Sequence, residues 1–144
     1  MKLQGHESLI QKGDTIVFLG GTHIVNEMKK GVMEASIYTK FKDYNLIFRD
    51  FSWEGDTVYH LSTVRERWRK EAFGDLQAQL KKVNANVIIA QFGAMESFDG
   101  LEKMYEFKNA YKEIISGLLK HDLRVIISEP APLAWSNAAS NNYL

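Results

Sequence analysis

The stretch Ile16–Ile24, "IVFLGGTHI", runs from four apolar residues directly into two glycines, a hydroxyl and an imidazole. A continuous apolar run is typical of a strand that is covered on both faces of a parallel sheet. The two glycines permit a sharp turn or a close approach of two backbones. Because ligands bind outside the carboxyl ends of the strands in open parallel sheets, this stretch predicts that Thr22 and His23 lie at a candidate site.

The remaining chain repeats this alternation of short apolar runs and helical patterns. The predicted strands are Thr15–Leu19, Asn45–Arg49, Val87–Gln91 and Arg124–Ser128. Helices are predicted from about Asn26 to Lys42, from Leu61 to Val83 with an interruption near Gly74, and from Leu101 to His121. The second strand is more mixed in composition and is expected nearer an edge. This order predicts a parallel sheet with helices on both sides.

Apolar residues at helical spacing predict which helix faces join the core. The first stripe consists of Met28, Val32, Met33, Ile37 and Phe41. The last stripe consists of Met104, Phe107, Tyr111, Ile114, Ile115 and Leu118.

Composition restricts the class of protein. The 144 residues are 45% hydrophobic and 25% charged, and 18 basic residues balance 18 acidic ones. This balance argues against nucleic acid or an anionic membrane as the main partner. The basic run Arg65, Arg67, Arg69 and Lys70 is interpreted as the solvated face of a helix, with a local basic patch as the alternative.

Cysteine usage and apolar run lengths exclude further classes. The absence of cysteine excludes disulfides, thiolate catalysis and zinc bound by cysteine. The start of the chain, "MKLQGHESLIQKGD", has no apolar core of signal-peptide length, and no apolar run is long enough to span a bilayer. We therefore expect a soluble chain, cytoplasmic if it is complete as given.

Four loops follow the predicted strands and hold the candidate groups: Gly20–Ile24, Asp50–Thr57, Phe92–Gly100 and Glu129–Trp135. In the first loop, Thr22 can help to hold an anion at the start of a helix. The alternative is that Thr22 only caps that helix and that His23 points to solvent. His23 and Glu27 are four residues apart, but two ligands without a third are weak support for a metal site.

The second and third loops add backbone and polar groups. Gly55, within "FSWEGDTV", can present a backbone N–H to a substrate oxyanion, although Gly-Asp-Thr is also ordinary turn chemistry. In "QFGAMESFDG", Gly93 makes the turn and Glu96 and Ser97 are polar groups at the top of the sheet. Met95 is expected to pack rather than to react.

Taken together, these loops resemble the blocks of the SGNH (GDSL-type) hydrolase superfamily. The successive segments "GDTIVFLGGT", "NLIFRDFSWEGDTV", "VIIAQFGAMESFDG" and "RVIISEPAP" follow the order of that family's first three blocks and fourth strand. The resemblance implies a three-layer flavodoxin-like α/β fold with a parallel sheet of four strands. It implies one SGNH-hydrolase-like domain over residues 1–144 that is incomplete at its C-terminus, with a final helix and strand missing.

The resemblance assigns roles to individual residues. Thr22 takes the nucleophile position, Gly55 the oxyanion glycine and Met95 the position of the oxyanion asparagine. Three departures follow: Gly21 replaces an aspartate, Thr22 adds a methyl group to a serine, and Met95 cannot donate a hydrogen bond. The family's Asp-x-x-His block, which supplies the base, would lie beyond Leu144. Further binding positions are Gly20, Gly21, His23, Trp53 and Glu96, and neither a cofactor nor a metal is expected.

Three hypotheses remain open at this point. The first is ester hydrolysis of acyl or acetyl groups on a small molecule or an acylated carbohydrate. The second is a catalytically silent domain that binds carbohydrate or a protein through Trp53, Phe98 and Trp135. The third, a nucleotide or phosphate binder at Gly20–Thr22, lacks the usual glycine-rich fingerprint. An uncovered sheet edge offers a further surface for association.

Overall fold

The computed structural model describes residues 8–59 and 70–129. Its centre is a four-stranded parallel sheet in the order β2-β1-β3-β4. Strand β1 lies in the middle and every one of its residues is buried. The elements are β1 (Thr15–Gly20), α1 (Thr22–Lys30), α2 (Val32–Lys40), η1 (Lys42–Tyr44), β2 (Ile47–Asp50), α4 (Leu76–Lys82), β3 (Val87–Gln91), η3 (Glu96–Asp99), η4 (Leu101–Lys103), α5 (Met104–Leu119) and β4 (Arg124–Ile127).

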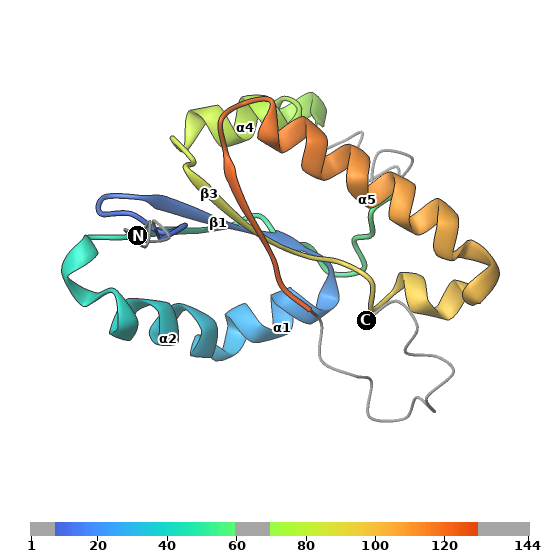
Figure 1. Cartoon of the computed structure of the whole chain (residues 1–144), viewed down its shortest axis with the longest axis horizontal. Helices are drawn as coiled ribbons and strands as arrows, with labels where there is room; N and C mark the ends of the chain where they lie inside the picture. The colour runs from blue at the N-terminus through green and yellow to red at the C-terminus, as the bar shows by residue number, and fades with distance from the viewer. Residues whose placement is uncertain (1–7, 60–69, 130–144) are drawn as a thin grey trace, which may run out of the picture.

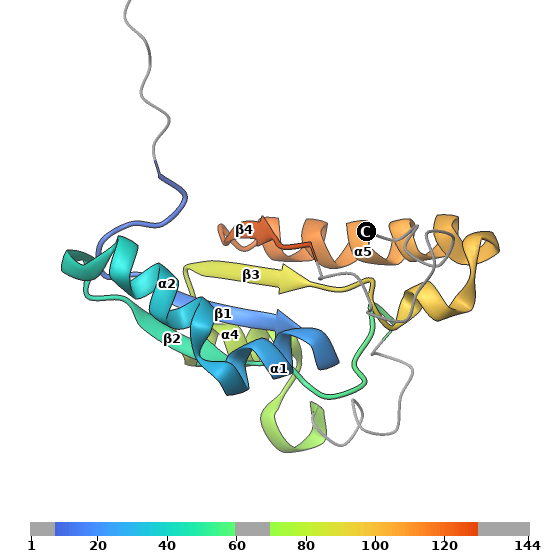
Figure 2. The same ribbon diagram turned by 90° about the horizontal axis from the view of Figure 1, so that it is seen from below.

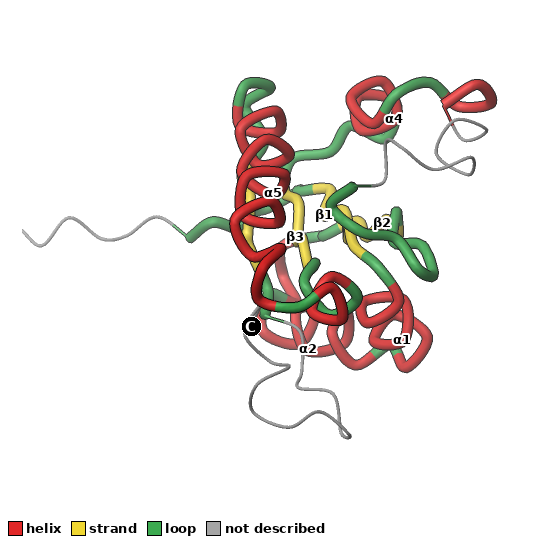
Figure 3. Tube along the Cα trace, turned by 90° about the vertical axis from the view of Figure 1, so that its right-hand side faces the viewer, coloured by secondary structure: helices red, strands yellow, loops and turns green. Residues whose placement is uncertain are grey.

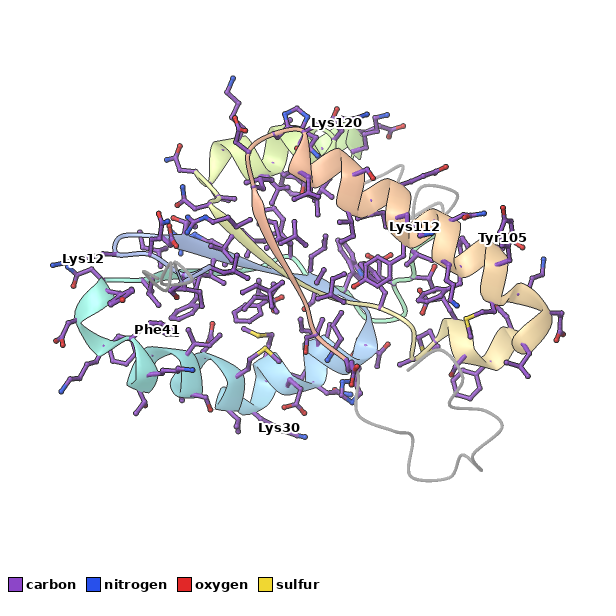
Figure 4. The ribbon with its side chains drawn as sticks, viewed as in Figure 1. Lys12, Lys30, Phe41, Tyr105, Lys112 and Lys120 are labelled. Atoms are coloured by element: carbon purple, nitrogen blue, oxygen red, sulfur yellow. The ribbon has the colours of Figure 1, made fainter. Side chains whose placement is uncertain are left out.

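Helices cover both faces of this sheet, which confirms the predicted fold class. Helices α1 and α2 lie on one face and α4 and α5 on the other (Figures 1 and 3). The view from below shows the four strands side by side in their sheet order (Figure 2). Lys30 and Tyr105 lie on the outer sides of α1 and α5 (Figure 4). Among the described residues, no helix combines the length and the apolarity that a bilayer span requires.

The core consists of two clusters because successive strand residues point to opposite faces. On the α4–α5 side, Val17 and Leu19 pack with Ile88 and Ala90, and the whole predicted stripe of the last helix joins them. On the α1–α2 side, Ile16 and Phe18 pack with Val87 and Ile89. The nearly continuous apolar composition of β1 and β3 follows from this burial on both faces.

Several boundaries differ from the prediction, and left-handed residues determine two of them. The first predicted helix is two helices, because Gly31 adopts a left-handed conformation (φ 67°) that ends α1. Val32 consequently lies outside the packed stripe and is 56% exposed, whereas Met28, Met33, Ile37 and Phe41 pack against the core as predicted. Strand β2 begins at Ile47 rather than at Asn45, whose left-handed backbone (φ 53°) follows η1. Its position at an edge of the sheet is as predicted.

Several sequence predictions fall on residues outside the described ranges. They are the basic residues Arg65, Arg67 and Arg69, the first part of the helix predicted over Leu61–Val83, and Trp135.

A buried ion pair joins the start of the first strand to the last strand at the amino ends of the sheet. The Asp14 side chain is 6% exposed, and its Oδ1 accepts a hydrogen bond of 2.6 Å from Arg124. The other carboxylate oxygen accepts from the Gln11 amide, and Arg124 also donates to the Leu9 carbonyl oxygen at 2.9 Å. One guanidinium therefore connects β4 to the segment before β1.

We expect Arg124→Met to lower the free energy of unfolding by about 1–3 kcal/mol, because the buried Asp14 carboxylate loses its charged partner. Lys103→Met is the matched control, since it removes the exposed Lys103–Glu106 pair. That change should stay within about 0.5 kcal/mol. Urea unfolding of both variants gives the comparison, and equal effects would contradict the role of the Asp14–Arg124 pair.

Candidate active site

A hydrogen bond to Thr22 joins two of the predicted loops at the carboxyl end of β1. The Gly55 N–H donates to Thr22 Oγ1 at 2.7 Å, although the two residues are 33 positions apart in the chain. Thr22 is half-buried, and Gly55 has a left-handed backbone (φ 72°) in the turn that follows Trp53. This contact places a backbone amide on the threonine hydroxyl at the end of the central strand.

The two glycines of the first loop are required by close backbone contacts. A Cβ on Gly20 would lie 2.2 Å from the carbonyl oxygen of Gln91, and a Cβ on Gly21 would lie 2.3 Å from the carbonyl oxygen of Asp56. Both values are far below any normal contact between a Cβ and a backbone oxygen. Gly20 therefore permits the approach of β3, and Gly21 permits the approach of the second loop. The aspartate that the family has at position 21 does not fit this backbone.

The interpretation of Thr22 as a helix cap is wrong. Gly21 occupies the N-cap position of α1 and Thr22 is the first helical residue. The Thr22 hydroxyl bonds to the second loop and caps no amide of its own helix. The hydroxyl therefore faces the second loop, whereas a capping hydroxyl would face the amides of its own helix.

The second loop is fastened to the end of β1 by its backbone. The Trp53 N–H donates to the Gly20 carbonyl oxygen at 2.9 Å, and the Asp56 N–H donates to the Trp53 carbonyl oxygen at 3.0 Å. The Trp53 side chain is half-buried. Trp53 thus has a structural connection to the glycine turn in addition to the binding position that the sequence assigned to it.

Glu96 connects the third loop to the second. Its side chain is only 2% exposed. One carboxylate oxygen accepts from the Val58 amide at 2.7 Å and the other from the Gly93 amide at 3.0 Å. Burial raises the pKa of Glu96, and the nearby Asp56 charge adds to this, while the amide hydrogen bonds oppose it. The sequence placed Glu96 at the top of the sheet as a binding group, whereas both of its oxygens bond to backbone amides.

The imidazole of His23 is held by a residue that sequence analysis did not single out. His23 Nδ1 lies 3.1 Å from Oε1 of Gln91, the buried last residue of β3. The expectation that His23 points to solvent is therefore wrong. The available signal was a single polar residue at the end of the apolar run "VIIAQ". A buried amide at such a position needs hydrogen-bond partners, and the end of a neighbouring strand is where they lie.

A small pocket collects these groups at the carboxyl edge of the sheet. It is lined by Gly21, Thr22, His23, Asp56, Gln91, Phe92, Ala94, Met95 and Glu96. Its volume of about 10 Å³ holds roughly one water molecule. Thr22 and Met95 therefore share one pocket, and Gly55 reaches it through Thr22. Any larger ligand group would lie on the open rim, where Met95 is 39% exposed.

Among the described residues, no set of side chains suited to a metal lies at the carboxyl edge of the sheet. Glu27 bonds to Lys30 at 3.1 Å and His23 to Gln91, so the two weakly suggested ligands have other partners. No group of three or more histidine, aspartate or glutamate side chains suited to a metal occurs in the described part of the chain.

A second hollow, of about 600 Å³, lies at the opposite end of the sheet. Its lining includes Asn84 and Asn86, before β3, and His121 and Leu123, before β4. Ligands of open parallel sheets bind at the carboxyl ends of the strands. The smaller pocket, which contains Thr22, is therefore the better candidate.

Comparison with known proteins gives structural matches only. No family model and no curated protein matches the chain. It is similar to LAE5, an alpha/beta hydrolase enzyme from the metagenome of Lake Arreo, with a TM-score of 0.58 and 12% identity over 83% of this chain and 61% of that one. It is also similar to the psychrotrophic esterase EstA from Pseudoalteromonas sp., solved with monoethylphosphonate as inhibitor. The TM-score is 0.59 and the identity 12%, over 90% of this chain and 67% of that one.

A third similar structure is BT4096, a gut microbial diltiazem-metabolizing enzyme, with a TM-score of 0.60 and 17% identity over 93% of this chain and 32% of that one. At these identities the matches show a fold shared with hydrolases. The chain spans 61% of LAE5, 67% of EstA and 32% of BT4096.

The contacts of Gly21 predict that Gly21→Ala lowers the free energy of unfolding by about 3 kcal/mol, because the new methyl group displaces the second loop. Gly117→Ala in α5 is the matched control, since nothing lies within 4 Å of the added Cβ. That change should be neutral or stabilise the protein by about 0.5–1 kcal/mol. Chemical denaturation measures both, and a harmless Gly21→Ala would disprove the close approach.

The raised pKa of Glu96 predicts a specific pH dependence. The folded state binds the carboxyl proton more tightly than the unfolded state, so this group stabilises the fold most at low pH. The stability that wild type has in excess of Glu96→Gln should therefore be largest below pH 4.5, the ordinary pKa of a glutamate. It should decrease as the pH rises from there through the raised pKa of Glu96.

Glu106→Gln is the control for this measurement, because Glu106 is exposed on α5 and pairs with Lys103. Its difference from wild type should lack this pattern. A difference between wild type and Glu96→Gln that is constant or grows with pH would contradict the raised pKa.

Proposed function

We propose that the chain is an ester hydrolase of the SGNH type, acting on acyl or acetyl esters with the Thr22 hydroxyl as nucleophile. The observation that carries this proposal is the hydrogen bond of 2.7 Å from the Gly55 amide to Thr22 Oγ1 at the end of the central strand. It agrees with the roles that the family resemblance gives these two positions. The fold shared with EstA and LAE5 supports the same reaction class.

The proposed oxyanion site consists of backbone amides. The Gly55 N–H already points to the hydroxyl oxygen, so it is within reach of the oxygen that becomes negative when Thr22 attacks a carbonyl carbon. Thr22 is the first residue of α1, and its own N–H therefore has no acceptor within the helix. The helix dipole places partial positive charge at the same point.

In the proposed reaction, Thr22 Oγ1 attacks the ester carbonyl carbon while its proton passes to a base. Collapse of the tetrahedral intermediate expels the alcohol, which takes up a proton, and water then hydrolyses the acyl-enzyme to the free acid. Among the described residues, the Gly55 amide is the hydrogen-bond partner of Thr22 Oγ1. In the family that these loops resemble, a late Asp-x-x-His group supplies this base.

The pocket suggests the substrate class. With about 10 Å³, the pocket beside Thr22 takes a group of roughly the size of one water molecule, so a long acyl chain would have to lie on the open rim. Phe92 and Met95 line the pocket with apolar surface. A small acyl group such as acetyl, carried by a small molecule or a carbohydrate whose remainder lies on the open rim, is the substrate that we propose.

Met95 favours a second candidate function, a catalytically silent domain that binds carbohydrate or a protein. A thioether cannot donate the hydrogen bond that an asparagine supplies to an oxyanion, and loss of one such donor typically costs about 10²–10³ in rate. Trp53 and the 57% exposed Phe98 are then the proposed contact residues. In this second candidate function, the protein has the fold of the hydrolases and binds a ligand, but it does not hydrolyse it.

Hydrolysis of p-nitrophenyl acetate tests the proposal with three variants. Thr22→Ala should lower turnover by at least about 100-fold, because the nucleophile is lost. Thr22→Ser should retain or raise it, because it removes a methyl group next to the attacking oxygen. Thr39→Ala is the control that should not change it, since Thr39 is exposed on α2 and bonds to Ala35 of its own helix.

A phosphonate ester provides an independent readout. It should modify wild type and the Ser variant at position 22, as mass spectrometry of the digested protein would show, and leave Thr22→Ala unmodified. Equal hydrolysis by wild type and Thr22→Ala would reject Thr22 as the nucleophile. Binding of an acetylated saccharide without turnover would favour the silent domain.

A further inference from the structure

The buried amide of Gln91 connects three segments at the carboxyl edge of the sheet. Gln91 is 4% exposed and ends β3. Its Nε2 donates to the Glu129 carbonyl oxygen at 3.1 Å and lies 3.5 Å from Ser128 Oγ, both just after β4. Its Oε1 lies 3.1 Å from Nδ1 of His23 in α1.

These contacts determine which way the amide faces. The Glu129 carbonyl oxygen can only accept, so the amide group turned toward it must be the donor Nε2. The opposite orientation would place two acceptor oxygens at this distance without a proton between them. Oε1 therefore faces His23. Because an amide oxygen can only accept, the hydrogen bond between them requires a proton on Nδ1.

We propose that Gln91 is a positioning residue: whenever the His23 imidazole is neutral, Gln91 holds it in the Nδ1–H form, with the lone pair on Nε2. The second ring nitrogen of a histidine is set by the hydrogen bond of the first. Among the described residues, Nε2 has no hydrogen-bond partner, and His23 lines the same pocket as Thr22. Nε2 is thus the hydrogen-bond acceptor that this site offers to a hydroxyl group of a ligand.

The assignment of the His23 tautomer follows from the contacts of Gln91 alone. A role of this tautomer in catalysis rests on the proposed function. The first can therefore be measured without any catalytic activity. If Thr22-dependent turnover exists, loss of the Gln91 acceptor should lower kcat more than it raises KM, because the oriented nitrogen matters to the reacting state rather than to substrate binding.

Nitrogen-15 NMR of the histidine side chains tests the tautomer at a pH above the imidazole titration. Protonated and unprotonated ring nitrogens have widely separated chemical shifts, and His23→Gln identifies the signals of His23. We expect protonated Nδ1 and unprotonated Nε2 for His23 in the wild type. The exposed His121 is the reference for an imidazole in solvent.

One variant then assigns the tautomer to Gln91. Gln91→Met removes the acceptor while keeping the length of the side chain, so His23 should shift toward the Nε2–H form. An Nε2–H tautomer in the wild type would overturn the proposal, and so would an unchanged His23 in a folded Gln91→Met.

The result is separable from the proposed function. If His23 has the Nδ1–H tautomer in the wild type but the protein has no esterase activity, the role of Gln91 is supported and the proposed ester hydrolysis is rejected. Conversely, Gln91→Met can be tested in a protein with Thr22-dependent turnover. If neither the turnover nor the His23 tautomer changes, the proposed hydrolysis is supported and Gln91 is rejected as a positioning residue.

Discussion

The geometry of the site depends on the buried carboxylate of Glu96. Its two oxygens accept from backbone amides of two different loops, at Val58 and at Gly93. Neither amide lies within a helix or strand, so each would be left without an acceptor at a buried position if the carboxylate moved away. Two bonds of this kind fix the distance between the loop that carries Gly55 and the loop that carries Met95.

The rest of the site follows from backbone contacts that this arrangement permits. With the second loop held by Glu96, its carbonyl at Asp56 approaches Gly21, where only a glycine fits. The same loop brings the Gly55 amide to Thr22. The groups that meet at the end of β1 are thus mostly main-chain atoms. Side chains at the rim, such as Met95, can differ from those of related folds without disturbing this frame.

The sequence predicted the sheet well because burial on both faces makes β1 and β3 almost entirely apolar. It predicted less where a single backbone conformation decides the outcome, as at Gly31, which divides one expected helix into two. The sequence also predicted that the loops of Thr22, Gly55 and Met95 lie at one end of the sheet, where Thr22 and Met95 line one pocket and Gly55 bonds to Thr22. Gln91 was not recognisable, because its importance depends on partners 37 and 68 positions away in the chain. Periodicity contains no information on such long-range polar contacts.

The frame of this site and its chemistry depend on different residues. Glu96, Gly20 and Gly21 determine where Thr22 and the Gly55 amide lie, yet none of them needs to move a proton. A hydroxyl becomes an effective nucleophile only when a base accepts its proton, and the amide that bonds to Thr22 is a donor. The backbone contacts therefore hold the amide–hydroxyl pair in place whether or not a base completes the site. For this reason a fold shared with esterases and a catalytic activity are separate properties of this chain, and the second depends on the group that takes the Thr22 proton.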